Sequence, residues 1–297
     1  MNPSVDYWEQ VVFLEKVRNI VTAFCVVAGV GWFYLYDAQR GYSDLESPVY
    51  HYVPLSNRLD QDEKIQIVTY NLQFCEKIDL IVEDIERLEQ IKSADLFLFQ
   101  EVVGPPGGPH CVQELAEELN FYASYAPAMR HPKNNLDFGN AILSRWPIVD
   151  VQKFILPNRH LIWKTNRVAL KATVQHPQKN FDVVTVHLET LLGGSKYRTE
   201  QAQFVFEQLS VVRPVLVSGD WNTFSKQEIE DLERAAKQHA LVDMTKHIVQ
   251  TRPAWMGTWK LDHTFGRGFK NWRAGVVLEA KGSDHLPLWH EVELLDR

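Results

Sequence analysis

Residues 215–222 join a short apolar run to polar groups that a buried strand would carry into a cleft. Asp220 and Asn222 stand two positions apart, so on an extended chain their side chains point the same way. The first offers a carboxylate, and the second offers an amide that can donate to an anionic oxygen. Gly219 lets the backbone approach a ligand closely. The competing interpretation is an ordinary strand-to-loop turn, where Asp, Asn and Gly are common.

Other apolar runs of the chain end in the same way, which weakens the turn interpretation. The polar residues at or just past their ends are Asn71, Glu101, His187, Asp262 and the pair Asp284–His285. Polar groups at the carboxyl ends of central strands can converge in one cleft. We therefore expect one site built from residues that lie far apart in the sequence.

Hydrophobic periodicity predicts the elements that must position these residues. Alternating or continuous apolar runs predict strands, and apolar residues at spacings of three and four predict helices. The expected strands cover residues 64–70, 95–100, 121–126, 140–144, 166–175, 181–186 and 215–220, and the expected helices cover 76–92, 111–119, 196–211 and 226–238. This alternation indicates an α/β fold of two packed sheets covered by helices.

Residues 19–36 contain no charged residue and just reach the length that a helix needs to span a bilayer core. Trp32, Tyr34 and Tyr36 cluster at one end of this stretch, as in an interfacial aromatic belt. The favoured interpretation is an uncleaved transmembrane anchor, and the alternatives are a cleaved signal peptide and a buried core helix. The leader of residues 1–18 is long and holds acidic residues, which argues against a signal peptide.

The charges beside this stretch predict its orientation. Lys16 and Arg18 precede it and only Arg40 follows nearby, so the positive-inside rule leaves the large domain on the non-cytoplasmic side of the membrane. Residues 37–62 are polar and lack periodicity, which predicts a tether. The catalytic domain would then cover residues 63–297.

Composition limits the classes of partner. The chain has 297 residues, of which 45% are hydrophobic, so it can bury a large core. Its formal net charge of -7 provides no footprint for tight, non-specific nucleic-acid binding. Lys164, Arg167 and Lys171 alternate on one predicted strand and would form a modest basic patch, unless that face is simply solvated. The three cysteines lack the spacing of a zinc site.

Seven motifs, taken in chain order, resemble those of the endonuclease/exonuclease/phosphatase superfamily. They are Thr-Tyr-Asn (69–71), Gln-Glu (100–101), Gly-Asn-Ala-Ile-Leu-Ser-Arg (139–145), Val-His-Leu-Glu (186–189), Gly-Asp-Trp-Asn (219–222), Leu-Asp-His-Thr-Phe (261–265) and Ser-Asp-His-Leu-Pro (283–287). Each motif alone is weak, whereas the ordered set over residues 63–294 is specific. The resemblance implies a four-layer α/β/β/α sandwich and metal-dependent phosphoester hydrolysis. We expect the domain to be monomeric.

The resemblance also implies a metal site, and this chain departs from the family pattern at one position of that site. Glu101, a hard carboxylate, would hold Mg²⁺, with Mn²⁺ as a substitute, and Asn71 would help to orient the site. Asp284 would be a second acid at the metal site or behind it. Many relatives carry an acid two residues after the Asn, and this chain has Gln73 there. That amide puts a second, tightly held metal ion in doubt.

The catalytic roles implied by the resemblance fall on five residues. Asp220 would activate or orient the attacking water, and Asn222 would hold a phosphate oxygen. His285 would contact the phosphate or transfer a proton, with Asp262 fixing its tautomer. His187 would bind phosphate or protonate the leaving group, against the alternative of a structural histidine.

Other polar residues near the motifs receive structural interpretations. His263, where many relatives have an aromatic residue, is expected to be a structural substitution. Arg145, Arg198 and Arg267 could meet phosphate, but surface positions are favoured for all three. Glu189 is expected to support the site from behind.

Cys75 and Cys111 each follow one of two adjacent motif strands, on the same side of the predicted sheet. Outside the cytoplasm they could form a disulfide, and two free thiols are the alternative.

The substrate class stays open between three readings. The first is a phosphodiester or phosphomonoester of unspecified class, and the second is a sphingomyelinase-type lipid, with Trp163, Trp255, Trp259 and Trp272 as interfacial or packing aromatics. The third is a nucleic acid, which the lack of clustered Lys and Arg disfavours. An inactive binding module on the same fold is a fourth possibility, against which the intact motif set argues.

Overall fold

The computed structural model describes residues 17–23, 25–26, 42, 49–55, 63–131, 134–162 and 165–295. The chain divides into two units, Met1–Gly41 and Tyr42–Arg297. In the first unit, the described residues are helical. The predicted anchor of residues 19–36 lies largely outside the described residues, and no described helix is both long enough and apolar enough to span a bilayer.

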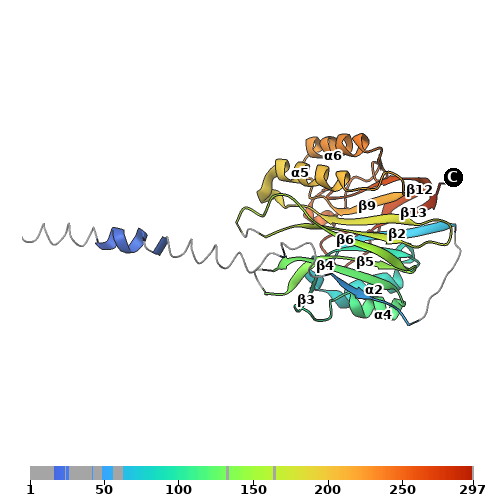
Figure 1. Ribbon diagram of the computed structural model, residues 1–297, viewed down its shortest axis with the longest axis horizontal. Helices are drawn as coiled ribbons and strands as arrows, with labels where there is room; N and C mark the ends of the chain where they lie inside the picture. Colours follow the sequence, from blue (N-terminus) through green and yellow to red (C-terminus); the bar gives the residue numbers. More distant parts are fainter. Residues whose placement is uncertain are drawn as a thin grey trace, which may run out of the picture. The chain divides into compact units, whose positions relative to one another are not determined.

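Two mixed sheets form the centre of the second unit (Figure 1). Within the described residues, sheet A runs in the order β1 (Tyr50–Tyr52), β4 (Tyr122–Arg130), β5 (Asp137–Ser144), β3 (Leu96–Gly104), β2 (Lys64–Asn71), β13 (Leu288–Leu294) and β12 (Phe269–Val276). Sheet B runs in the order β10 (Val242–Asp243), β11 (Asp262–Arg267), β9 (Val215–Asp220), β8 (Phe181–His187), β7 (Val168–Val174) and β6 (Ile148–Ile155).

Helices cover the outer face of each sheet (Figure 1). Sheet A packs against α2 (Ile78–Arg87), α3 (Glu89–Lys92) and α4 (Gln113–Leu119), and sheet B packs against α5 (Gly194–Glu207) and α6 (Lys226–Gln238). The layer between the sheets is aliphatic, with Ile67, Leu98, Leu170 and Val183 all fully buried. The α/β fold of two packed sheets flanked by helices is thereby confirmed.

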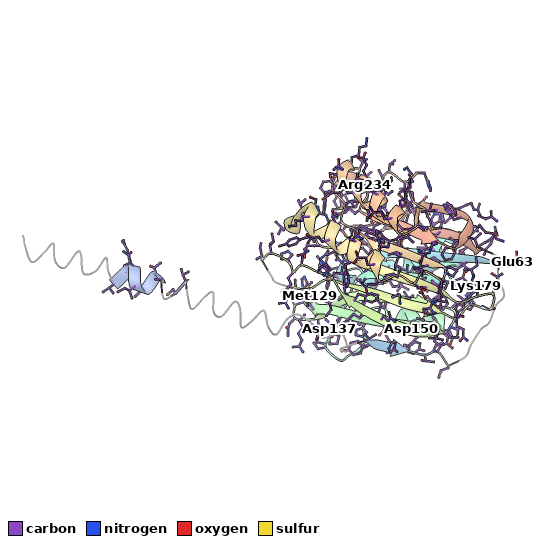
Figure 2. All side chains as sticks on the ribbon, turned by 45° about the horizontal axis from the view of Figure 1, so that its top comes forward. Glu63, Met129, Asp137, Asp150, Lys179 and Arg234 are labelled. Atoms are coloured by element: carbon purple, nitrogen blue, oxygen red, sulfur yellow. A yellow bond between two sulfur atoms is a disulfide. The ribbon has the colours of Figure 1, made fainter. Side chains whose placement is uncertain are left out.

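One parallel strand pair lies in each sheet, and the two pairs end at the same edge of the sandwich. β2 runs parallel to β3, and β8 runs parallel to β9. The sheets are joined there by Gln100, whose amide donates to Thr69 Oγ1 of sheet A and to Thr185 Oγ1 of sheet B. Figure 2 shows Met129 and Asp137 at this end and Glu63 and Lys179 at the opposite end. Polar residues that follow these strands therefore meet.

The structure corrects two expected boundaries. The helix predicted over 76–92 is broken at Leu88, whose ψ of 112° is extended, and it forms α2 and α3. The predicted tether of residues 37–62 contains β1, which pairs antiparallel with β4, and the second unit begins at Tyr42. The helix predicted over 226–238 matches α6, which Ser225 caps by accepting from the backbone N–H of Glu228.

Candidate active site

The two parallel strand pairs bring four of the predicted site residues together. Asn71 ends β2 and donates from Nδ2 to Asp220 Oδ2 over 3.1 Å. His187 ends β8, and its Nε2 lies 3.6 Å from Asp220 Oδ2 and 3.8 Å from Glu101 Oε1. The structure therefore places Asn71, Glu101, His187 and Asp220 in one cluster. This cluster spans both sheets.

Glu101 does not end its strand, as the sequence predicted, but lies in a bulge of β3. The register against β5 shifts between Phe99 and Val102, and the φ of Glu101 is 57°. An extended residue would alternate inward or outward with its neighbours, whereas the bulge turns this side chain toward the strand ends. Its side chain is 16% exposed, more than those of Asp220 and His187. Glu101 is the carboxylate that solvent and ligands can reach.

The end of β9 is shaped by a close backbone approach. Gly219 has a φ of 146°, and a Cβ there would lie 2.2 Å from the carbonyl oxygen of Val186. After Asp220 the chain turns through Asn222, whose φ is 50° and whose backbone N–H donates to Asp220 Oδ1 over 2.9 Å. Asn222 Nδ2 donates to the carbonyl of Leu188 over 3.1 Å. Both polar residues of the opening motif therefore belong to the site, and Asn222 also fixes the end of β8.

His285 and Asp262 complete the cluster from the other side. His285 Nδ1 lies 2.9 Å from Asp262 Oδ2, and its Nε2 lies 3.7 Å from Asp220 Oδ2. Asp262 is the first residue of β11 and pairs with Asp220 across the sheet. The loop that holds His285 is fixed by Asp84, whose Oδ2 accepts from the backbone N–H groups of Lys281 and Gly282. The carboxylate–imidazole pair that the sequence predicted is present.

Arg167 is a site residue that the sequence placed only in a basic patch on a strand. Its Nη1 lies 3.2 Å from both ring nitrogens of His187, and its side chain is buried. β7 pairs antiparallel with β8, with Ala169 opposite Val186, which puts Arg167 beside the strand end that carries His187. A guanidinium held at a cluster of acids is a natural phosphate ligand. The register of β7 against β8 is the feature that would have identified Arg167 as a site residue.

Burial and charge set the protonation states of the site. Burial raises the pKa of Asp220 to about 6, although nearby His285 opposes the shift. Burial by itself lowers the pKa of His285, but the carboxylates of Asp262 and Asp220 outweigh it and raise that pKa to about 10. Burial, Arg167 and His285 hold the pKa of His187 well below its ordinary value. At neutral pH the site therefore combines an ionised Asp220, a protonated His285 and a neutral His187.

The donor set at Glu101 fits a hard divalent cation. Among the described residues, no group of three or more His, Cys, Asp and Glu side chains is arranged to hold a metal. Mg²⁺ does not need such a cage, because it keeps several waters and binds through one or two carboxylates. Burial raises the pKa of Glu101 to about 7, and a hydrogen bond from Asn71 opposes the shift. A bound cation would offset the remaining cost of ionising this carboxylate.

Asp284, predicted as a metal-site acid, is engaged elsewhere. Its carboxylate forms an ion pair with Arg252, which also donates from Nε to the Asp284 carbonyl over 3.1 Å. Gln73 donates its backbone N–H to Asn71 Oδ1, and its side chain carries no charge for a second cation. These contacts concentrate the available negative charge on Glu101 and Asp220.

Four residues that were expected to lie outside the chemistry contact other residues of the protein. Arg145 pairs with Asp95, Arg198 pairs with Glu228, and Arg267 donates to two backbone carbonyls. Two of these arginines are not the surface charges that were expected, since Arg198 is buried and Arg267 is partly buried. His263 is fully buried, and its Nε2 lies 2.8 Å from Thr223 Oγ1. All four side chains therefore have partners within the protein.

Cys75 and Cys111 form a disulfide. Cys75 ends η1 (Gln73–Cys75), the turn that follows Asn71, and Cys111 precedes α4. Gln73, Phe74 and Cys75 all have positive φ, between 47° and 57°. Non-glycine residues in this region cost about 1–3 kcal/mol each and persist only where the surroundings hold them. The bridge is one such restraint, next to a residue of the site.

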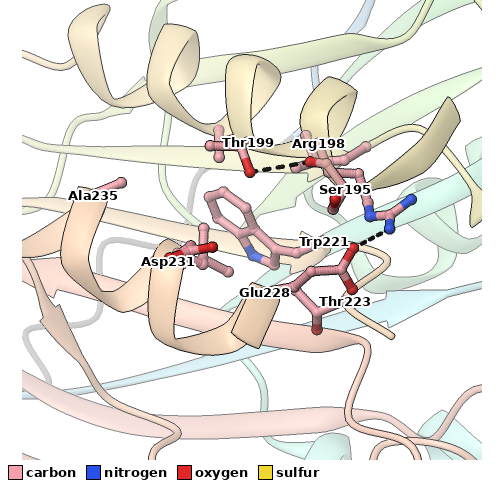
Figure 3. Close-up of a pocket in the computed structure, with 11 residues that line it drawn as sticks. Ser195, Arg198, Thr199, Trp221, Thr223, Glu228, Asp231 and Ala235 are labelled. Carbon is pink, nitrogen blue, oxygen red and sulfur yellow. Dashed lines mark hydrogen bonds and ion pairs between the residues drawn. The ribbon is translucent and has the colours of Figure 1, made fainter. Parts of the chain in front are cut away.

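A small cavity between α5 and α6 is separate from the cluster (Figure 3). It holds about 20 Å³ and lies over Trp221, beside the ion pair of Arg198 and Glu228. Trp221 is fully buried and donates from Nε1 to the carbonyl of His263 over 3.0 Å. This region packs the end of β9 against the helices and offers little more than the room of a water.

The family model of the Endonuclease/Exonuclease/phosphatase family matches residues 68–285, from within β2 to His285. The chain belongs to the Endonuclease/Exonuclease/phosphatase family. Members of this family are mostly metal-dependent phosphoesterases. The matched segment contains every predicted site residue.

One sequence relative and one solved structure show the range of similarity to this chain. UPF0294 protein YE0917 of Yersinia enterocolitica is 29% identical over 119 residues, and the match covers 40% of this chain and 45% of that protein. The human Nocturnin catalytic domain with bound sulfate has a TM-score of 0.64 at 21% identity, over 87% of this chain and 98% of that chain.

Two further structures of the fold have names that refer to different compounds, DNA and sphingomyelin. Danio rerio TDP2 complexed with a single-strand DNA product has a TM-score of 0.60 at 16% identity, over 78% of this chain and 100% of that chain. Sphingomyelinase C of Streptomyces griseocarneus has a TM-score of 0.58 at 17% identity, over 77% and 99%. The Endonuclease/Exonuclease/phosphatase fold alone therefore leaves the substrate class open.

Proposed function

We propose that the second unit hydrolyses a phosphodiester or phosphomonoester by direct attack of a water, with the help of a divalent cation. The observation that carries this proposal is the convergence on one carboxylate oxygen, Asp220 Oδ2, of Asn71, His187 and His285. An ionised carboxylate with a pKa of about 6 is a suitable general base at neutral pH.

Each residue has one task in this reaction. Asp220 takes a proton from the water as the water oxygen bonds to phosphorus and the bond to the leaving oxygen breaks. The leaving oxygen departs as an anion and takes its proton from solvent. Protonated His285 donates to a phosphoryl oxygen, and Asp262 keeps it protonated and oriented. Arg167 and Asn222 bind the remaining phosphoryl oxygens. Neutral His187, which contacts Arg167, helps to orient the phosphoryl group.

Mg²⁺ is the proposed cation, with Mn²⁺ as a substitute. Glu101 and Asn71 would hold it, and it would supply charge neutralisation at the phosphoryl group. The ion pair of Asp284 with Arg252 and the neutral side chain of Gln73 support one cation per chain rather than two.

The test compares the purified full chain with Asp220→Asn on bis-p-nitrophenyl phosphate. We expect EDTA to abolish hydrolysis, Mg²⁺ or Mn²⁺ to restore it, and Asp220→Asn to lower kcat by about 10²–10⁴-fold. Asp150→Asn, on β6 at the other end of the sheet, is the matched control. Activity that survives EDTA or Asp220→Asn would refute the proposal. Mg²⁺ should also raise Tm, and Glu101→Gln should remove that shift.

We further propose a membrane-anchored protein with this domain on the non-cytoplasmic side. The uncharged stretch of residues 19–36 and the flanking Lys16 and Arg18 support it. The disulfide of Cys75 and Cys111 supports it independently, since such bonds persist in oxidising compartments.

A further inference from the structure

Three loops adjoin the strand ends that carry the site, after β6, after β8 and before β11, and each exposes apolar side chains. We name residues 156–162, 188–194 and 249–261 the mouth loops. Leu161 and Ile162 are exposed on the first, and Leu191 and Leu192 are 59% and 56% exposed on the second. On the third, Trp255 is 81% exposed. Such side chains are costly to leave in water, so several gathered around one opening indicate a contact surface.

Each mouth loop is fastened at its base to the site. Leu156 donates its backbone N–H to the carbonyl of Arg167, and Leu188 donates to the carbonyl of Asp220. In the third loop, Thr251 Oγ1 accepts from the backbone N–H of Asp262 over 3.1 Å. The apolar residues are therefore carried by segments whose position the catalytic residues fix.

The chain path limits how far the apolar residues can lie from the chemistry. Leu191 is four residues beyond His187, and an extended chain of that length spans at most roughly 14 Å. Trp255 is three residues beyond Arg252, so it lies within roughly 10 Å of the Arg252 backbone, and the Arg252 side chain pairs with Asp284, the neighbour of His285. A partner that covers Leu191 would therefore lie close to His187.

The charges of the mouth loops distinguish between possible binding partners. Their sequences contain one acidic residue, Glu189, and it is buried. Arg159 is the exposed charged residue in the described part of the loops. Binding to a nucleic-acid backbone needs clustered Lys and Arg, and these loops have no such cluster. The net charge of the chain, -7, also disfavours it. Leu, Ile and Trp with an occasional basic residue are the side chains that enter a bilayer interface.

We propose that the mouth loops dock the domain on a lipid bilayer and that the substrate is a phosphoester in a lipid head group. This proposal rests on the proposed function and names its substrate class. The docked site would face the head groups, so the phosphoester would be hydrolysed without leaving the bilayer.

The chain offers a matched control for the leucine pair. Val211 and Val212 are 84% and 83% exposed, and they precede β9, at the opposite end of the sandwich from Asp220. The double variant Val211→Ser/Val212→Ser therefore removes an even more exposed apolar pair far from the mouth. Trp272, on β12 and 41% exposed, serves the same purpose for Trp255.

The experiment measures hydrolysis by the full chain of two substrates: sphingomyelin in phosphatidylcholine vesicles, and soluble bis-p-nitrophenyl phosphate. We expect Leu191→Ser/Leu192→Ser to lower the vesicle rate about tenfold or more and to leave the soluble rate within about twofold. The valine double variant should change neither rate. Equal losses on both substrates, or an equal loss in the valine variant, would overturn the proposal.

A second readout does not depend on turnover or on the choice of lipid substrate. Brominated phosphatidylcholine vesicles should quench Trp255, so the quenched fraction of the tryptophan fluorescence should fall in Trp255→Phe and not in Trp272→Phe. An unchanged fraction in Trp255→Phe would refute docking. If bis-p-nitrophenyl phosphate is not hydrolysed by the wild type, the proposed chemistry fails, and quenching still decides the docking. Faster hydrolysis of plasmid DNA than of any vesicle lipid would assign the site to nucleic acid.

Discussion

Asp262 determines the protonation of His285, and this makes a pH profile informative. The proposed reaction needs Asp220 ionised and His285 protonated, so activity should rise as pH passes about 6 and fall as pH passes about 10. In Asp262→Asn the alkaline limb should move down by about 1–3 pH units, because the nearest opposite charge is lost. Asp150→Asn should leave the profile unchanged. An unmoved alkaline limb would show that another group controls it.

The same pair should appear in the pH dependence of stability. The pKa of His285 is higher in the folded chain than its ordinary value of 6.5, so folding favours its protonated form. The stabilisation is fully present below pH 6.5 and is lost as pH rises through about 10. Urea unfolding of Asp262→Asn should lack this alkaline loss.

Arg167 should act on both the substrate and His187. Arg167→Met is expected to lower kcat/KM by about 10²–10³-fold, since it removes a donor aimed at developing charge. The pKa of His187 should rise, because one of the two cations that hold it down is gone. NMR titration of the His187 ring measures that shift, and Lys171→Met on β7 is the control. A large loss of activity with no change at His187 would contradict the assigned contact.

At the scale of elements, the disulfide holds the turn that follows β2. Cysteine replacement, Cys75→Ser/Cys111→Ser, should lower the free energy of unfolding by about 4 kcal/mol for a separation of 36 residues. Urea unfolding with and without reductant measures this. Unfolded, unreduced protein should show one reactive thiol, Cys25, and three after reduction. Three thiols before reduction would mean that the bridge is absent in solution.

Strand ends were predictable from the sequence because burial and chain polarity act locally. A strand buried on both faces is a continuous apolar run, and its polar terminus is visible as Asn71, His187 or Asp220. The same reasoning located α6 by its amphipathic spacing and its Ser225 cap.

Features that depend on distant pairing could not be predicted in this way. Nothing in the local sequence of Glu101 signals a bulge, since the register shift exists only against β5. β1 is three residues long and needs β4, more than 70 residues away, to form. Arg167 directly precedes β7, and the pairing of β7 with β8 is what places it beside His187.

At the scale of the whole molecule, the orientation of the chain in a membrane is testable. The prediction is that the protein stays in the membrane fraction after alkaline washing and that protease digests the second unit in intact spheroplasts. The uncharged stretch of residues 19–36 and its flanking charges are the reason. A cytoplasmic marker protein should stay intact in the same samples. Digestion of the second unit only after lysis would reverse the orientation.

The backbone conformation of Glu101 has a consequence for how the protein can evolve. Its left-handed φ of 57° is strained for any residue with a Cβ, and glycine at this position would remove the strain together with the carboxylate. If Glu101 holds the cation as proposed, a substitution that relieves the backbone strain would therefore also abolish hydrolysis. In a lineage that no longer needs the reaction, we expect this position to drift first, and the surviving descendants to be well-folded proteins without activity.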